Sequence, residues 1–194
     1  MGRKRRRTGD STKLKEARLG EFINFPETVH GRSIISFKSP IQKMQQAVIE
    51  AMLYLNGHEE PRLLSHSALS MEMQGVMGFE IGIADGIFFD NLDEETASGV
   101  TGYFSLKSGY RILDFLVITT YRYSREGRIL PLKFDHHLLR FFFNAGKIEV
   151  LLHHSQGTRR LPLDELLQKI FDELRRIARR ERLGKIKVEA TKTL

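Results

Sequence analysis

Positively charged side chains gather at the two ends of the sequence, where they could bind a polyanion. Residues 1–18 contain eight Lys or Arg and two acidic residues, a net charge of +6. Residues 172–194 contain eight Lys or Arg and four acidic residues, a net charge of +4, and residues 19–171 carry −3. Lys and Arg neutralise phosphates and release counterions, so binding of this kind weakens steeply with salt. The asymmetry indicates a polyanionic partner, with nucleic acid ahead of a membrane surface.

Cations from both ends are the candidate phosphate contacts. Residues 1–18 contain no aromatic residue, so we expect them to bind the nucleic-acid backbone and not to stack on bases. The alternative for this segment is a solubilising tail, or a nuclear import signal in a eukaryote. The alternative for the C-terminal group is a solvated helix end, because cations in a last helical turn complement the macrodipole without any partner. The candidates are Arg3, Lys4, Arg5, Arg6, Arg7, Lys13, Lys15, Arg175, Arg176, Arg179, Arg180 and Arg182.

The histidines form a second group with chemical potential. If Ala145-Gly146 is the turn of a hairpin, His137 faces His154 directly across the two strands and continues an apolar face. Two cross-strand imidazoles can share a metal ion, with Asp135 completing the shell. The competing interpretation is that they are ordinary sheet residues at the rim of the core. We favour that interpretation, so no metal and no cofactor is predicted.

Apart from one tripeptide, the sequence contains no motif typical of enzymes. Asp135-His136-His137 spells the short motif of the DHH phosphoesterases, which are metal-dependent. That family also carries an upstream aspartate-rich motif and a second domain, which have no counterpart here, so the tripeptide assigns no family. The chain has no cysteine, no Gly-rich phosphate loop, no Gly-x-Ser-x-Gly elbow and no His-Glu-x-x-His helix. A non-catalytic function is therefore favoured.

The helices and strands that the sequence predicts, and that must position these residues, make up an α+β fold. We expect a mostly antiparallel sheet of meanders and hairpins, with two main helices at about 40–56 and 163–183 packed on it. Residues 111–123 form the clearest strand, residues 102–107 a further strand, and residues 57–70 a connection. Strands and helices do not alternate strictly, which argues against a doubly wound nucleotide-binding fold and a TIM barrel.

Three regions are expected along the chain. Residues 1–18 form a basic, flexible arm, residues 19–184 a single α+β domain, and residues 185–194 a short basic tail. Hydrophobic residues make up 41% of the sequence, enough to bury a real core. No apolar run reaches the roughly 18 residues that a membrane span needs, and no cysteine is present. We therefore expect a cytoplasmic protein, or a nuclear one in a eukaryote, without a membrane partner.

These features predict a non-catalytic nucleic-acid-binding protein, with RNA favoured over DNA, that acts in a ribonucleoprotein. The arm and the arginines of the last helix are expected to contact phosphates. One alternative is a metal-dependent phosphodiester hydrolase with a His/Asp site. The other is a scaffold or assembly subunit, whose partner is a different protein or a second copy of the chain.

Overall fold

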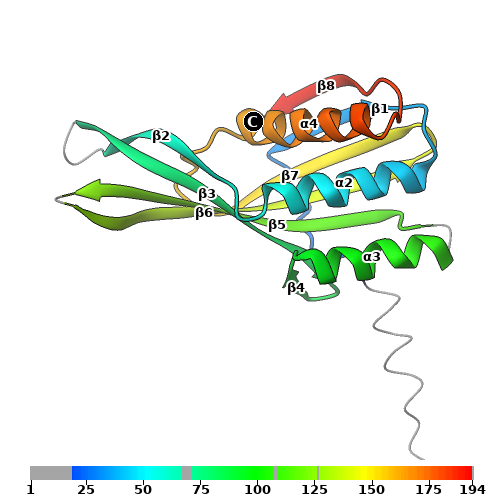
Figure 1. Cartoon of the computed structure of the whole chain (residues 1–194), viewed down its shortest axis with the longest axis horizontal. Helices are drawn as coiled ribbons and strands as arrows, with labels where there is room; N and C mark the ends of the chain where they lie inside the picture. The colour runs from blue at the N-terminus through cyan, green and yellow to red at the C-terminus, as the bar shows by residue number, and fades with distance from the viewer. Residues whose placement is uncertain (1–18, 67–70, 107–108, 126, 194) are drawn as a thin grey trace, which may run out of the picture.

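A curled antiparallel sheet with three helices on one face makes up the described part of the chain (Figure 1). The computed structural model describes residues 19–66, 71–106, 109–125 and 127–193. The elements are β1 (Gly31–Ser36), α2 (Ile41–Leu55), β2 (Glu59–His66), β3 (Met71–Asp85), β4 (Phe88–Asn91), α3 (Glu94–Leu106), β5 (Ile112–Arg125), β6 (Arg128–Asn144), β7 (Lys147–Gly157), α4 (Leu163–Arg180) and β8 (Lys187–Thr193). The α+β prediction is confirmed.

The strands lie in the order β2-β3-β5-β6-β7-β1-β8, and β4 pairs with β3. The predicted hairpin register is correct, because Asn144 pairs with Lys147 and His137 pairs with His154. A register shift between His136 and His137 accompanies that last pair. Alternation along β5 and β6 turns one set of side chains toward the helices and the other set toward what we call the open face, the side of the sheet without helices.

The helices lie side by side on the sheet, with α2 between α3 and α4 (Figure 1). Their apolar residues join those of the strands in one core, which includes Met52, Phe115, Phe141 and Phe171. No helix of the described residues is long and apolar enough to cross a membrane.

Four expectations about the elements need correction. The structure has three helices and not two, because α3 includes residues 102–106 of the segment that we expected to be a strand. The last helix ends at Arg180, three residues before the predicted end. Residues 57–70 are more than a connection, since β2 runs through Glu59–His66. The predicted tail contributes β8, which pairs with β1 at the sheet edge.

The two hairpins β2–β3 and β5–β6 project beyond the helices as an extension of the sheet (Figure 1). The side of this extension that continues the helix-covered face is closed, because Leu64, Met77 and Tyr121 are buried there in the core. Two ion pairs tie β2 to α4. Arg62 donates to Glu165, with one contact of 2.8 Å, and Lys169 Nζ lies 2.8 Å from a Glu60 carboxylate oxygen.

Candidate nucleic-acid interface

The arginines of α4 face outward because the opposite side of this helix is strongly apolar. Leucine, isoleucine and phenylalanine side chains recur at helical spacing and are buried against the sheet and α2, as the period of 3.6 requires. These residues are Leu166, Leu167, Ile170, Phe171, Leu174 and Ile177. The remaining positions of the last turns, which carry the arginines, are left to solvent.

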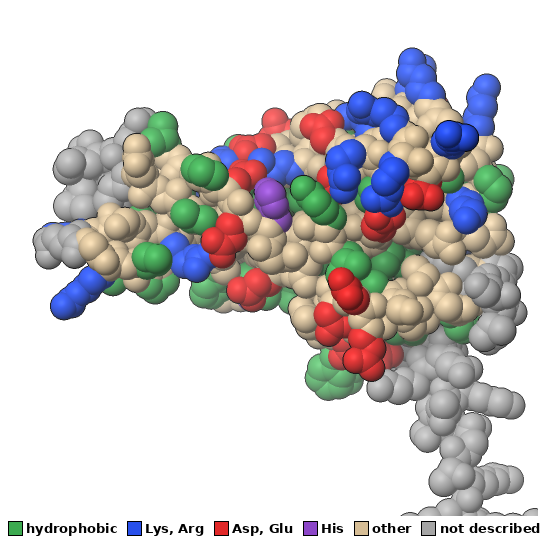
Figure 2. Space-filling model, in the orientation of Figure 1, with side chains coloured by type: hydrophobic (Ala, Val, Ile, Leu, Met, Phe, Trp, Pro, Cys, Tyr) green, Lys and Arg blue, Asp and Glu red, His purple; other side chains and the backbone are tan. Residues whose placement is uncertain are grey.

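Arginine and lysine side chains surround a hollow of about 620 Å³ beside the C-terminal end of α4. Its lining residues are Arg175, Ala178, Arg179, Arg182, Gly184, Lys185 and Ile186, with no acidic residue among them. Figure 2 shows the blue Lys and Arg side chains gathered at this end of the molecule, whereas red acidic side chains gather near α3 and β4. We call this hollow, together with its four cations Arg175, Arg179, Arg182 and Lys185, the basic hollow.

Ion pairs within the protein divide the predicted arginines into two groups. Arg176 Nε lies 2.9 Å from Glu173, and its guanidinium lies 4.6 Å from the centre of the Tyr54 ring. Arg180 binds Glu50 of α2 and lies 2.9 Å from Glu181. Their charges are therefore compensated inside the molecule, and they brace α4 against its neighbours.

The second group carries positive charge that the described carboxylates do not fully neutralise. Arg175 Nη1 lies 2.8 Å from Asp172, but its side chain also lines the basic hollow. Arg179, Arg182 and Lys185 have no carboxylate within ion-pair distance in the part of the chain that the structure describes. Arg182 and Lys185 follow the last residue of the helix, so the macrodipole of its final turn does not account for them.

Lys185 was not among the sequence candidates. Helix α4 ends at Arg180, and the chain then turns through Arg182 and Gly184, whose φ values are +54° and +84°. Gly184 is the sequence signal for this turn, which places Lys185 in the lining of the hollow with Arg179. The other predicted contacts, Arg3, Lys4, Arg5, Arg6, Arg7, Lys13 and Lys15, lie outside the described residues. Among the described residues, the candidate site is therefore the basic hollow alone.

Comparison of the chain with models of known families, with curated proteins and with solved structures finds no match. What the protein does must therefore be inferred from its own residues.

The predicted histidine cluster does come together, at the end of the core next to the extension. The His137 and His154 ring centres are 5.1 Å apart, and His154 Nε2 lies 3.7 Å from Asp135 Oδ1. Asp135 is already occupied, because it accepts hydrogen bonds from Tyr121 Oη at 2.8 Å and from the backbone N–H groups of Arg159 and Arg160 at 2.7 and 2.8 Å. Within the described residues, no three His, Asp or Glu side chains are arranged to hold a metal ion.

The environment of this cluster sets its charges. Burial raises the pKa of Asp135, but the hydrogen bonds from Tyr121 and the two backbone N–H groups outweigh burial and leave the pKa below its ordinary value. Burial, helped by the neighbouring His154, lowers the pKa of His137 to about 4. At neutral pH the cluster thus contains a carboxylate, a neutral imidazole at His137 and a tyrosine hydroxyl. Asp135 serves to fix the chain at residues 159–160 against the sheet.

Proposed function

We propose that this protein binds nucleic acid without catalysis and that the basic hollow contacts phosphates. The observation that carries the proposal is the set of four cations around one hollow with no acidic residue in its lining. A phosphate backbone supplies closely spaced negative charges that such a group can neutralise. The arm adds eight further cations, which extends the contact along the polymer.

RNA is the favoured polymer because of how the helices lie. Sequence readout of duplex DNA commonly places a helix in the major groove. Each described helix instead lies flat on the sheet with one face buried, and none projects from the molecule (Figure 1). Contacts to a phosphate backbone, which do not need a protruding helix, fit this surface better.

A pair of matched double variants tests the proposal. Arg179→Gln with Arg182→Gln removes two charges that have no partner in the described chain. Arg176→Gln with Arg180→Gln removes two charges from the same helical end that Glu173 and Glu50 already compensate. We expect the first variant to lose about tenfold in affinity for single-stranded RNA, and to flatten the plot of log affinity against log salt by about one per lost contact.

The measurement is fluorescence anisotropy on mixed-sequence RNA and on duplex DNA of equal length, between about 50 and 200 mM salt. The control variant should keep most of the affinity and of the salt slope. If both variants lose equal affinity, or the control loses more, the basic hollow is not the binding site. If the unaltered protein binds neither polymer, the proposed function is wrong.

A further inference from the structure

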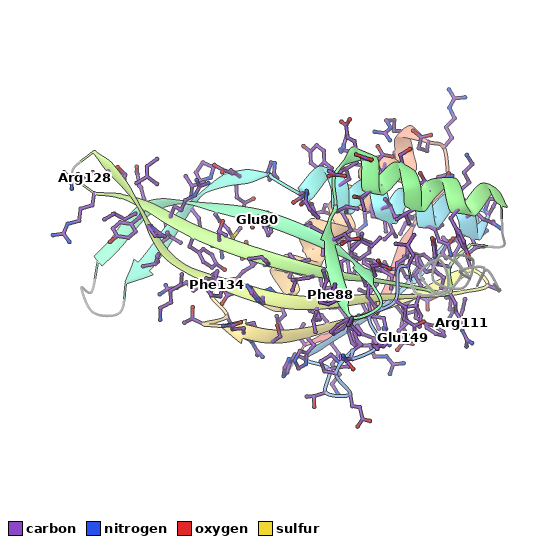
Figure 3. All side chains as sticks on the ribbon, turned by 90° about the horizontal axis from the view of Figure 1, so that it is seen from below. Glu80, Phe88, Arg111, Arg128, Phe134 and Glu149 are labelled. Atoms are coloured by element: carbon purple, nitrogen blue, oxygen red, sulfur yellow. The ribbon has the colours of Figure 1, made fainter. Side chains whose placement is uncertain are left out.

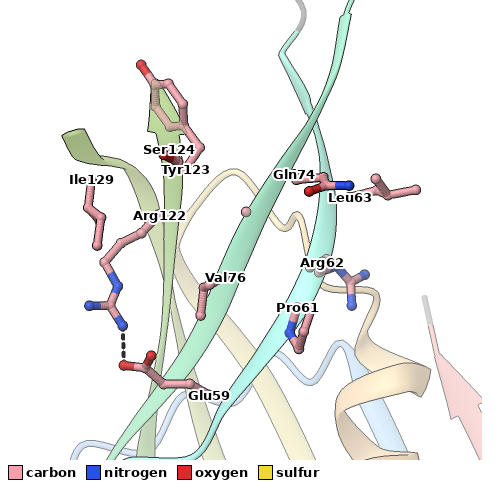
Figure 4. Close-up of a pocket in the computed structure, with 11 residues that line it drawn as sticks. Glu59, Pro61, Arg62, Leu63, Gln74, Val76, Arg122, Tyr123, Ser124 and Ile129 are labelled. Carbon is pink, nitrogen blue, oxygen red and sulfur yellow. Dashed lines mark hydrogen bonds and ion pairs between the residues drawn. The ribbon is translucent and has the colours of Figure 1, made fainter. Parts of the chain in front are cut away.

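Two other hollows of the described surface are at least as large as the basic hollow, but carboxylates line both of them. In one, of about 650 Å³, Glu59 forms an ion pair with Arg122 (Figure 4). The other, of about 900 Å³, is lined by Glu59 and by Glu80, which is exposed on β3 (Figure 3). The basic hollow has four cations and no carboxylate in its lining. Of these three hollows, it is the one whose potential attracts an anion.

The four cations of the basic hollow surround one concave space. Arg175 and Arg179 are four residues apart on α4 and share a face of the helix. Arg182 follows in the turn after the helix, and Lys185 precedes β8. A surface that follows a nucleic-acid backbone is instead a stripe or groove of cations. The volume of about 620 Å³ is typical of a pocket that encloses one small ligand, so the basic hollow suits a single compact anion.

The backbone at Arg182 adopts a conformation that favours glycine. Its φ is +54°, in the left-handed region. The Leu183 N–H donates to the Ala178 carbonyl oxygen at 2.9 Å. The Arg182 N–H donates to the Arg179 carbonyl oxygen at 3.3 Å, and the two bonds together form a Schellman motif. The left-handed residue of this motif is usually glycine, because a Cβ costs free energy there. An arginine at this position strains the backbone, and such strain is common at functional sites.

We infer that the basic hollow holds the phosphate group at an end of a nucleic-acid strand, and that Arg182 binds this phosphate. The inference rests on the proposed function, because it concerns the same site. A terminal phosphate carries a charge of about −1.5 to −2 at pH 7 and three free oxygens. A phosphate within the strand carries a single charge and is flanked by nucleotides on both sides, so it cannot enter a pocket as far. Converging guanidinium groups, each of which can bind two oxygens, therefore favour the end of the strand.

Three single-stranded RNAs of one sequence test the ligand: one with a 5′ phosphate, one with a 3′ phosphate and one with neither, each with an internal fluorophore. We expect the unaltered protein to bind one of the phosphorylated strands at least about tenfold more tightly than the unphosphorylated strand. Equal affinity for all three strands overturns the inference. The proposed function still stands in that case if Arg179→Gln with Arg182→Gln weakens the binding of all three.

Adenosine 5′-monophosphate distinguishes the end of a strand from a free nucleotide. As a competitor, it should displace the phosphorylated strand only at concentrations well above the dissociation constant of that strand, because the arm contacts the rest of the polymer. If the mononucleotide binds as tightly as the phosphorylated strand, the ligand of the basic hollow is a free nucleotide and the inference is wrong.

Arg182→Gly separates binding from folding, because it removes the charge and relieves the backbone at the same time. We expect the melting temperature to rise by about 2–4 °C and the preference for the phosphorylated strand to disappear. Arg159→Gly is the matched control. Arg159 also has a positive φ, of +50°, but it lies outside the basic hollow, and glycine keeps the N–H that Asp135 accepts. This control should keep the preference.

Two results would overturn the role of Arg182. One is a lower melting temperature in Arg182→Gly, which would show that the arginine stabilises the fold. The other is a preference for the phosphorylated strand that Arg182→Gly retains or that Arg159→Gly loses to the same extent.

Discussion

His137 is fully buried, yet neither nitrogen of its ring has a hydrogen-bond partner among the described residues. A buried polar group without a partner costs about 1–3 kcal/mol, whereas an apolar side chain of similar shape at the same place costs nothing of this kind. Its pKa of about 4 means that the ring stays neutral through the physiological range. The residue therefore packs as part of the core.

His137 should make the stability of the protein fall with acidity. Its folded pKa is about 4 and its ordinary pKa is 6.5. Between these values the unfolded chain binds a proton that the folded chain does not, so stability is lost as pH falls from about 6.5 to about 4, by about 3 kcal/mol. The measurement is urea unfolding at pH 7, 5.5 and 4.5 for the unaltered protein and for His137→Leu.

The variant should be at least as stable as the unaltered protein at pH 7 and more stable at pH 5.5 and 4.5. A smaller acid dependence should remain, because burial lowers the pKa of His30 and of His136 in the same direction. Asp135 acts below this window, since its pKa is held under the ordinary 3.8. A loss of more than about 2 kcal/mol in His137→Leu at pH 7 would contradict the prediction, because it would show that the ring makes a polar contact of real value.

Among the elements, the ion pair between Asp114 of β5 and Arg140 of β6 helps to hold the segment before β1 on the open face. Asp114 is 1% exposed and accepts hydrogen bonds from Arg140 Nε at 2.8 Å and from the Phe22 N–H at 2.7 Å. Arg140 also donates to the Phe22 carbonyl oxygen at 3.0 Å, and its guanidinium lies 4.3 Å from the centre of the Phe25 ring. Two strands and the N-terminal segment thus meet at this ion pair, and backbone hydrogen bonds from Gly20 N–H to Ala84 and from Ile23 N–H to Gly86 hold the segment as well.

Arg140→Leu should destabilise the fold by about 3–5 kcal/mol, because it leaves the Asp114 carboxylate buried without its counter-charge. Burial already raises the pKa of Asp114 above its ordinary value although Arg140 favours the charged form. The double variant Asp114→Leu with Arg140→Leu should recover much of the loss, since no unpaired charge remains. Thermal unfolding of the three proteins measures this, and a double variant no more stable than the single one would assign the loss to the packing of Phe22 and Phe25.

The sequence was sufficient to predict helices and strands with strong apolar periodicity. It was insufficient for elements whose structure depends on tertiary contacts. The β6–β7 register and the pairing of His137 with His154 followed from keeping one face apolar. Helix α3 contains two glycines and β-branched residues, which lower its helix propensity. It forms because Ala97 and Val100 pack in the core, beside Leu92 just before the helix. A local signal was nevertheless present, because Asp93 accepts the Thr96 N–H at 2.8 Å as an N-cap, a contact that lowers the pKa of its carboxyl group.

The sequence predicted only part of the candidate site, for a similar reason. Charge counts located the C-terminal arginines, but no count separates Arg176 and Arg180, which have partners on Glu173 and Glu50, from Arg179 and Arg182. Glu50 is 130 residues from Arg180 in the chain, so this pairing depends on how α2 packs against α4. Strand β2 was missed because proline is uncommon inside a strand, so Pro61 made residues 57–70 look like a connection.

At the scale of the whole molecule, positive and negative charges occupy different regions. The basic hollow lies at the end of α4, and acidic side chains gather near α3 and β4 (Figure 2). Leu19, the first described residue, forms a bridge with Asp85 at the end of β3, so the arm joins the body at a place distinct from the hollow. Two separated basic regions can bind one polymer at two points, which raises the affinity beyond that of either region alone.

Removal of residues 1–18 should therefore lower both the affinity for RNA and its salt dependence. These residues carry eight Lys or Arg, so the slope of log affinity against log salt should flatten by up to about 6 for a single strand, about 0.7 per contact. The fold should be unaffected, because the core of the described residues is complete without this segment, and the melting temperature is the control. Combining the deletion with Arg179→Gln and Arg182→Gln should reduce the affinity further, by about the product of the separate factors if the two regions act independently. If the deletion changes neither affinity nor slope, the arm has no part in binding, and the basic hollow alone must account for it.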